Sequence, residues 1–283
     1  MKEKEKKQEE HQKKLEEKSD QVKSGKKYSD ILSRVIHEGD EMFKIKNKAI
    51  FLSAILAGLE IGFSYFMICT LYYLLDGSVD QDILIKSFGF VYPVGFILVI
   101  LGKSVLFTEQ TSLLALPVLN GQRSMLEMLR IWGVVIAGNV IGGIIFTFFI
   151  GTLGPHLGLF TSDTMAFVGT HILDHDAWVL FLSAIAAGWL MGLLTWLLNS
   201  TETSLTRIVI IFMITGVIGF GGFHHSIVGS IEAFGAYLHS GSVSIWDYLW
   251  FLLLALVGNS VGGAIVVGLF KYRIFESNYA DEV

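Results

Sequence analysis

Six long apolar stretches dominate the chain from residue 49 onward. The hydrocarbon core of a bilayer is about 30 Å thick, so a helix needs roughly 20 apolar residues to cross it. Five Lys or Arg residues lie between Ala49 and Phe270, out of 21 in the 283-residue chain. The pattern predicts an all-α membrane protein with six transmembrane helices. The stretches are Ala49–Leu75, Ile85–Leu116, Met125–Gly151, Trp178–Leu198, Ile208–Leu238 and Trp246–Phe270.

The second half of these stretches repeats the first half. Phe-Leu-Ser-Ala-Ile-x-Ala-Gly begins at Phe51 in the first stretch and again at Phe181 in the fourth. Gly-Asn-x-x-Gly-Gly begins at Gly138 in the third stretch and again at Gly258 in the sixth. Each half contains three helices, an odd number, so the two halves face opposite ways across the membrane.

The second and fifth stretches are interrupted, which predicts two broken helices. The interruptions cover Leu106–Thr111 and Gly219–Ser226, and they align as Phe107-Thr108-Glu109 against Phe223-His224-His225. Irregular backbone at membrane depth is tolerated where it is buried or lines a wet cavity. Paired breaks in inverted halves therefore indicate a solute site near the midplane. Simple glycine kinks are the structural alternative.

The charges divide the chain into four segments and orient it. Residues 1–27 hold ten Lys and seven Asp or Glu, which predicts a disordered cytoplasmic arm. An apolar stripe over 28–46 predicts an amphipathic cytoplasmic helix that anchors the chain or covers the pore mouth. The channel domain spans 47–272, and 273–283 form a cytoplasmic tail. The loops 77–84, 152–177 and 239–245 lack Lys and Arg, so both termini are predicted to be cytoplasmic, in the inner (plasma) membrane.

Two motifs at the breaks resemble those of the formate/nitrite transporter family. Leu106-Phe107-Thr108 is similar to the loop that interrupts helix two in that family, and Gly222-Phe223-His224-His225-Ser226 to the loop that interrupts helix five. The resemblance covers roughly residues 40–275. It implies an aquaporin-like protomer with its own pore, a homopentamer, and passive or proton-linked passage of small monovalent anions of weak acids such as formate, nitrite, hydrosulfide or lactate. It also implies that His225 is the central pore histidine.

The resemblance further implies three apolar constriction residues, Tyr92, Phe96 and Ile218, which by sequence are equally good packing residues. The chain also departs from the family pattern. Glu109 stands where characterised anion channels carry a small uncharged residue. The family's lysine before helix four has no counterpart, because 152–177 contains no Lys. These departures indicate a divergent branch.

Polar residues near the breaks are the candidates for the solute pathway. A buried histidine is neutral where desolvation dominates, and it can then donate a hydrogen bond to an anion or pass it a proton. His225 is the leading candidate, and a helix-capping role is the alternative for it and for His224. An ionised carboxylate here would favour a cation or a proton-coupled solute, or serve protomer packing. The predicted pathway residues are His225, Thr108, Glu109, His224, Leu106, Phe107 and Glu60.

Other classes of function have weaker support. His171 and His175 share a helical spacing, but no third histidine is placed to complete a metal site. No hydrolase motif or phosphate-binding loop occurs, so we predict no enzyme activity, catalytic residue, metal, cofactor or nucleic-acid partner. The predicted partners are the small anion, the lipid bilayer and four further copies of the chain. Two alternatives stay open: a channel for another small neutral or cationic solute, and a membrane scaffold with an occluded pore.

Overall fold

The computed structural model describes residues 27–279, and every regular element in that part of the chain is helical. The predicted arm, apart from residue 27, and the last four residues of the predicted tail lie outside it. Six helices are long and apolar enough to cross a membrane. They are α3 (Asn47–Leu75), α4 with α5 (Gln81–Val91 and Pro93–Gly102), α7 (Met125–His156), α9 (Ala177–Ser200), α10 (Ser204–Gly221), and α12 continued by η1 and α13 (Ile245–Ser260, Val261–Leu269 and Phe270–Tyr279).

The second and fifth helices are broken, as predicted, and each continues as a shorter helix after four residues. Residues 103–106 separate α5 from α6 (Phe107–Leu119), and residues 222–225 separate α10 from α11 (Ser226–His239). The first break therefore lies before Phe107, not at the predicted Leu106–Thr111. Lys103 and Gly222 end their helices in the left-handed region, each with φ of 63°. In this conformation the backbone N–H of the capping residue donates to the last carbonyl groups of the helix, which ends the helix.

These two caps give the register of the inverted repeat and correct the alignment above. With Lys103 opposite Gly222, Val105 is the counterpart of His224, and Leu106 is the counterpart of His225. Both members of the second pair are helix N-caps, of α6 and α11 respectively. Thr108 is therefore not the repeat partner of His224.

Small residues bring the repeated helices close together. In the first half, Gly142 of α7 packs against the carbonyl oxygen of Ile55 in α3. In the second half, Gly262 packs in the same way against the carbonyl oxygen of Ile185 in α9. A side chain at either glycine would overlap backbone that cannot move away, so these seams require glycine.

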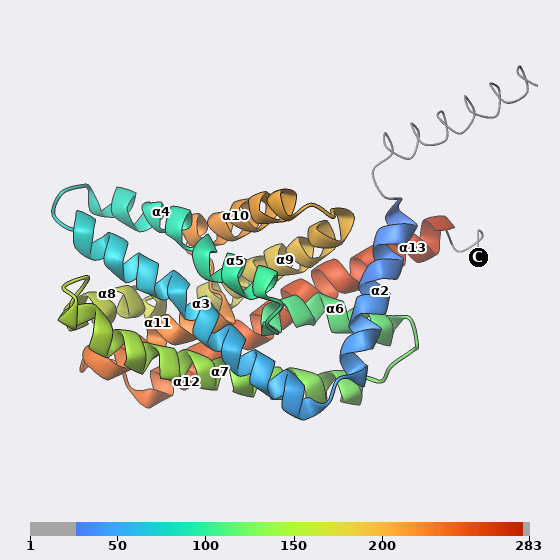
Figure 1. Ribbon diagram of the computed structural model, residues 1–283, viewed down its shortest axis with the longest axis horizontal. Helices are drawn as coiled ribbons and strands as arrows, with labels where there is room; N and C mark the ends of the chain where they lie inside the picture. Colours follow the sequence, from blue (N-terminus) through green and yellow to red (C-terminus); the bar gives the residue numbers. More distant parts are fainter. Residues whose placement is uncertain (1–26, 280–283) are drawn as a thin grey trace, which may run out of the picture.

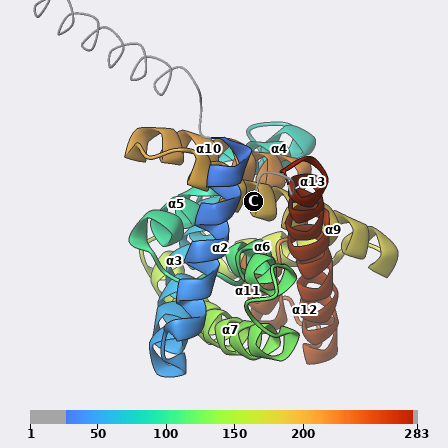
Figure 2. The ribbon, with the colours of Figure 1, turned by 90° about the vertical axis from the view of Figure 1, so that its right-hand side faces the viewer.

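Two helices outside the six spans cover the ends of the bundle. Figure 1 shows α2 (Tyr28–Lys44) lying across one end and α8 (Ser162–Leu173) at the other. Figure 2 looks onto the first end, where α2 packs on α6 and α9. At the second end α8 packs along α11, so the predicted loop 152–177 contains a docked helix. We refer to these as the α2 end and the α8 end.

Candidate functional site

The two broken helices meet in a direct contact between side chains. Oγ1 of Thr108, in the first turn of α6, lies 2.8 Å from Nε2 of His225, the residue before α11. Both side chains are completely buried. This contact joins the broken helix of one half of the repeat to that of the other.

Hydrogen bonds around His225 assign its tautomer. The backbone N–H of Val228 donates to Nδ1, 3.2 Å away, so the lone pair of Nδ1 is occupied. The single proton of the neutral ring then lies on Nε2, which donates to the oxygen of Thr108. The hydroxyl hydrogen of Thr108 is left to point elsewhere. The oxygen of Thr108 thus accepts from His225, and its O–H remains free to donate to another group.

Two buried asparagines hold the breaks in shape. Asn139 of α7 accepts from the N–H of Phe107 and donates to the carbonyl groups of Ala54 and Val105. Asn259 of α12 repeats all three bonds, accepting from Ser226 and donating to Ala184 and His224. Buried polar backbone needs such partners. Each asparagine therefore ties the start of a half-helix to the neighbouring long helix.

An apolar collar surrounds the contact. The ring of Phe96 packs edge-on against the ring of His225, with centroids 5.0 Å apart, and Tyr92 packs against Phe96 at 5.3 Å. Ile218 is completely buried on the α10 side of the same region. Phe96 thus lies against the histidine and Tyr92 against Phe96, while Ile218 lines the same small cavity as Tyr92.

A small chamber lies beyond the collar, toward the α8 end. Its volume is about 50 Å³. Apolar side chains form most of its wall, and the polar groups in it are those of Tyr92, His171 and Glu232. Since one water needs roughly 10–15 Å³ of such volume, the chamber has room for a few waters or one solute of about that size. Neither Thr108 nor His225 lines it, so the chamber does not reach their contact.

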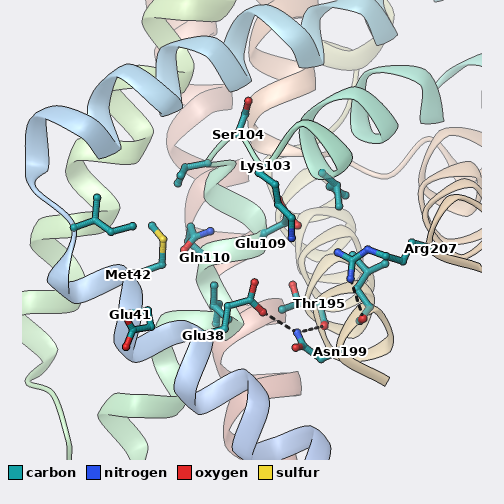
Figure 3. Close-up of a pocket in the computed structure, with 15 residues that line it drawn as sticks. Glu38, Glu41, Met42, Lys103, Ser104, Glu109, Gln110, Thr195, Asn199 and Arg207 are labelled. Carbon is teal, nitrogen blue, oxygen red and sulfur yellow. Dashed lines mark hydrogen bonds between the residues drawn. The ribbon is translucent and has the colours of Figure 1, made fainter. Parts of the chain in front are cut away.

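A larger and more polar vestibule opens on the α2 side, with a volume of about 260 Å³. Figure 3 shows Glu38 from α2, Lys103 from the break, Glu109 from α6 and Arg207 from α10 gathered around one space. Glu38 accepts a hydrogen bond from Asn199 at 3.2 Å. The vestibule therefore carries charges of both signs, and α2 forms one of its walls.

The structure brings some of the predicted pathway residues together and leaves others apart. Glu109 lines the vestibule at the α2 end. Glu60, in contrast, lies half-buried on α3 beside Gly102, and Phe107 packs on Trp132 at 5.7 Å between ring centroids. The side chains of Glu60, Leu106 and Phe107 line neither the chamber nor the vestibule.

His224 points away from the contact between the broken helices. Its Nε2 donates to the carbonyl of Ile172 at 3.1 Å, and its Nδ1 accepts from the hydroxyl of Ser183 at 2.7 Å. Ser183 also accepts from the backbone N–H of His224. In the described residues no group of three metal-binding side chains forms, so His171 and His175 lack the further ligands that a site would need.

Sequence reasoning missed three residues of this region: Asn139, Asn259 and Glu232. The asparagines stand inside the repeated Gly-Asn-x-x-Gly-Gly motif, which by sequence serves only to identify the repeat. Glu232 is a single carboxyl group in an apolar stretch, and that rarity alone is a signal of function. Its place in the chamber depends on the packing of α11, which the sequence does not display.

Two inverted broken helices that meet at a buried polar contact, with an opening on either side, define a channel-type transport protein rather than an enzyme. The chain belongs to the formate/nitrite transporter family, whose model matches residues 29–273. It is 30% identical over 258 residues to the inner membrane protein YfdC of Escherichia coli, covering 89% of this chain and 80% of that protein. It is 28% identical to the nitrite transporter NirC of Escherichia coli, covering 77% and 80%.

Solved structures agree on the fold. An ion channel of the same family superposes with a TM-score of 0.78 at 22% identity, covering 87% of this chain and 99% of that one. A pentameric formate channel with formate bound superposes with a TM-score of 0.67 at 21% identity, covering 81% and 97%. The predicted fold class, six helices in two inverted halves with the second and fifth broken, is confirmed. The chain is a multi-pass membrane transport protein.

Proposed function

We propose that the protein carries small monovalent anions of weak acids across the membrane in a proton-linked manner. The observation that supports this most is the buried contact of Thr108 with His225 between two openings. The names of its relatives agree with such a solute, because one is a nitrite transporter and one solved neighbour has formate bound.

The apolar collar makes a proton link necessary. An anion that enters a dry apolar passage loses its hydration, which costs far more than the loss for a neutral molecule. A weak acid avoids most of this cost by crossing in its protonated form. The hydroxyl of Thr108, oriented by His225, can then donate a hydrogen bond to the acid's oxygen or sulfur while the solute passes.

The proposal includes the orientation of the chain in the membrane and its assembly into an oligomer. The α2 end carries the Lys and Arg residues of the short loops and of the chain end, among them Arg123, Arg207 and Arg273. The positive-inside rule then places this end and both termini in the cytoplasm. The pentameric formate channel with a similar fold supports a homopentamer with one pore in each protomer.

Uptake into liposomes containing the full chain tests the function. Formate, nitrite and hydrosulfide are compared with Na⁺ and glycerol, at several values between about pH 5 and 8. We expect uptake of the three weak-acid anions to rise as the pH falls, with Na⁺ and glycerol at the level of empty liposomes. Uptake of none of the three anions, in liposomes where native mass spectrometry finds intact oligomers, would contradict the proposal.

A cationic solute is the second candidate. It is favoured by the carboxyl groups of Glu38 and Glu109 in one opening and of Glu232 in the other. An anion entering past ionised carboxylates is repelled, whereas a cation is attracted. The Na⁺ measurement in the same experiment separates the two candidates.

A further inference from the structure

Glu232 is a buried carboxyl group that the site described above does not use. It lies on α11, seven residues after His225. Seven residues are two helical turns, so the two side chains project on the same side of α11, about 10 Å apart along its axis. Glu232 is 4% exposed, and its side chain lines the chamber next to the apolar collar. A solute that moves between the α8 end and Thr108 therefore passes this carboxyl group.

Glu232 has no cationic neighbour in the part of the chain that the structure describes. The titratable groups that face it are Tyr65 and Cys69 from α3, Tyr92 and His171. In the described residues, the parts of α7 and α12 that pack on α11 near Glu232 carry uncharged side chains and glycine, as where Tyr248 lies beside Ser230 and Phe251 packs on Gly229. Burial, and next the neighbouring His175, lowers the pKa of His171, so that ring is neutral at pH 7.

An ionised carboxylate without a partner is expensive in such a place. A neutral carboxylic acid is far less costly, and it carries one O–H that it can donate or transfer. No hydrogen bond joins this carboxyl group to another described residue. Its proton is thus available to whatever occupies the chamber.

His225 is poorly suited to supply a proton itself. Its one ring proton lies on Nε2, and losing it would leave an imidazolate anion in a dry site. Taking up a second proton at Nδ1 would break the bond from Val228 that caps α11. The histidine can orient Thr108, but a proton-linked passage needs another group that exchanges a proton, and the chamber contains one.

We propose that Glu232 is the proton donor for solutes entering from the α8 end. An arriving weak-acid anion accepts a hydrogen bond from the carboxylic acid. The O–H bond of Glu232 breaks, a new O–H or S–H bond forms on the solute, and the neutral acid moves on past Thr108 and His225. The carboxylate left behind regains its proton from water on the α8 side. The anion of a strong acid, such as chloride, cannot take this proton and is excluded.

This inference rests on the proposed function, and the experiment separates the two. Liposomes with the full chain and a trapped pH dye receive formate or chloride outside, and uptake of formate and of protons is recorded together. The variants are Glu232→Gln, which keeps the shape without an exchangeable acid proton, and Glu232→Asp, which keeps the acid. We expect Glu232→Gln to lose about tenfold or more in formate uptake and in coupled proton uptake, and Glu232→Asp to retain most of both.

Glu232→Gln with wild-type formate uptake and an unchanged pH profile would overturn the role of Glu232 while leaving the proposed function intact. Wild-type protein that takes up no weak-acid anion would overturn the function itself. Infrared difference spectra of the wild type provide a second measurement that needs no variant to fold. Formate should reduce the carbonyl band of a protonated carboxyl group, and absence of any such change also overturns the proposal.

Discussion

Asn139 and Asn259 make the same three hydrogen bonds in the two inverted halves of the protein, one set at each broken helix. Both side chains are completely buried. The starts of α6 and α11 are therefore positioned by the same set of hydrogen bonds, one set in each half. The distance between Thr108 and His225 depends on both copies.

Removing either asparagine should destabilise the protein and disturb the contact. Asn139→Ala leaves one N–H and two carbonyl groups without this partner, so we expect a loss of about 3 kcal/mol. Asn259→Ala should lose a similar amount because its bonds are the same. Unfolding followed by helical circular dichroism in detergent measures both. A loss of less than about 0.5 kcal/mol in either variant would show that the bonds do not hold the breaks.

Two variants of His225, one to asparagine and one to alanine, test whether this position needs a helix cap and a donor toward Thr108. His225→Asn keeps a good N-cap and an N–H donor toward Thr108, whereas His225→Ala removes both, at about 1 kcal/mol of stability. We expect His225→Asn to keep most of the formate uptake. His225→Ala should alter the pH profile of uptake between about pH 5 and 8. A wild-type profile in His225→Ala would mean that the histidine is purely structural.

The serines of the two halves form a matched pair. Ser53 accepts one hydrogen bond, from the backbone N–H of Val105, whereas Ser183 accepts from the backbone of His224 and also donates to its ring. Ser183→Ala should therefore cost about 1 kcal/mol more than Ser53→Ala. Thermal unfolding of the two variants side by side measures the difference. Equal losses would contradict the ring bond.

Close helix contact should make Gly142 intolerant of any side chain. A methyl group there would overlap the carbonyl of Ile55, so Gly142→Ala should destabilise by about 1–3 kcal/mol. Gly133, on the same helix, faces open space and is the control. Gly133→Ala should leave stability unchanged or raise it by up to about 1 kcal/mol, since alanine favours the helix. Similar losses of stability at both positions would contradict the close contact of Gly142 with α3.

The attachment of α2 should depend on acid pH through Asp40. A hydrogen bond from Arg123, and next one from Lys44, lowers the pKa of Asp40 from 3.8 to about 2. A lowered pKa means that the pair stabilises the fold above about pH 4 and that this contribution is lost as pH falls toward 2. The stability difference between wild type and Arg123→Gln should therefore shrink over that interval.

The control for this pH dependence is Arg273→Gln, because Arg273 pairs with Glu276 on its own helix and not with α2. At neutral pH, Arg273→Gln should lose less stability relative to wild type than Arg123→Gln does. A wild-type minus Arg123→Gln difference that stays constant from pH 4 to pH 2 would show that Asp40 does not hold α2.

Much of this architecture is a local property of the chain. Runs of apolar residues determine the six spans, because hydropathy acts on each segment separately. The repeated motifs at Phe51 and Phe181 determine the inverted halves, and the interruptions near Thr108 and His225 determine that each half contains a broken helix. The family can also be recognised from the sequence, because its motifs can be compared residue by residue.

The tertiary structure decided what those residues do. Asn139 bonds to residues 32 to 85 positions away along the chain, so its role as a clamp follows only from how α7 packs on α3. The tautomer of His225 depends on one backbone N–H, and the place of Glu232 depends on the rotation of α11 against α8. Glu60 and Glu109 have the same chemistry in the sequence, yet packing puts one beside Gly102 and the other in the vestibule. Burial and hydrogen-bond geometry are set by neighbours in space, and these are known only once the helices are assembled.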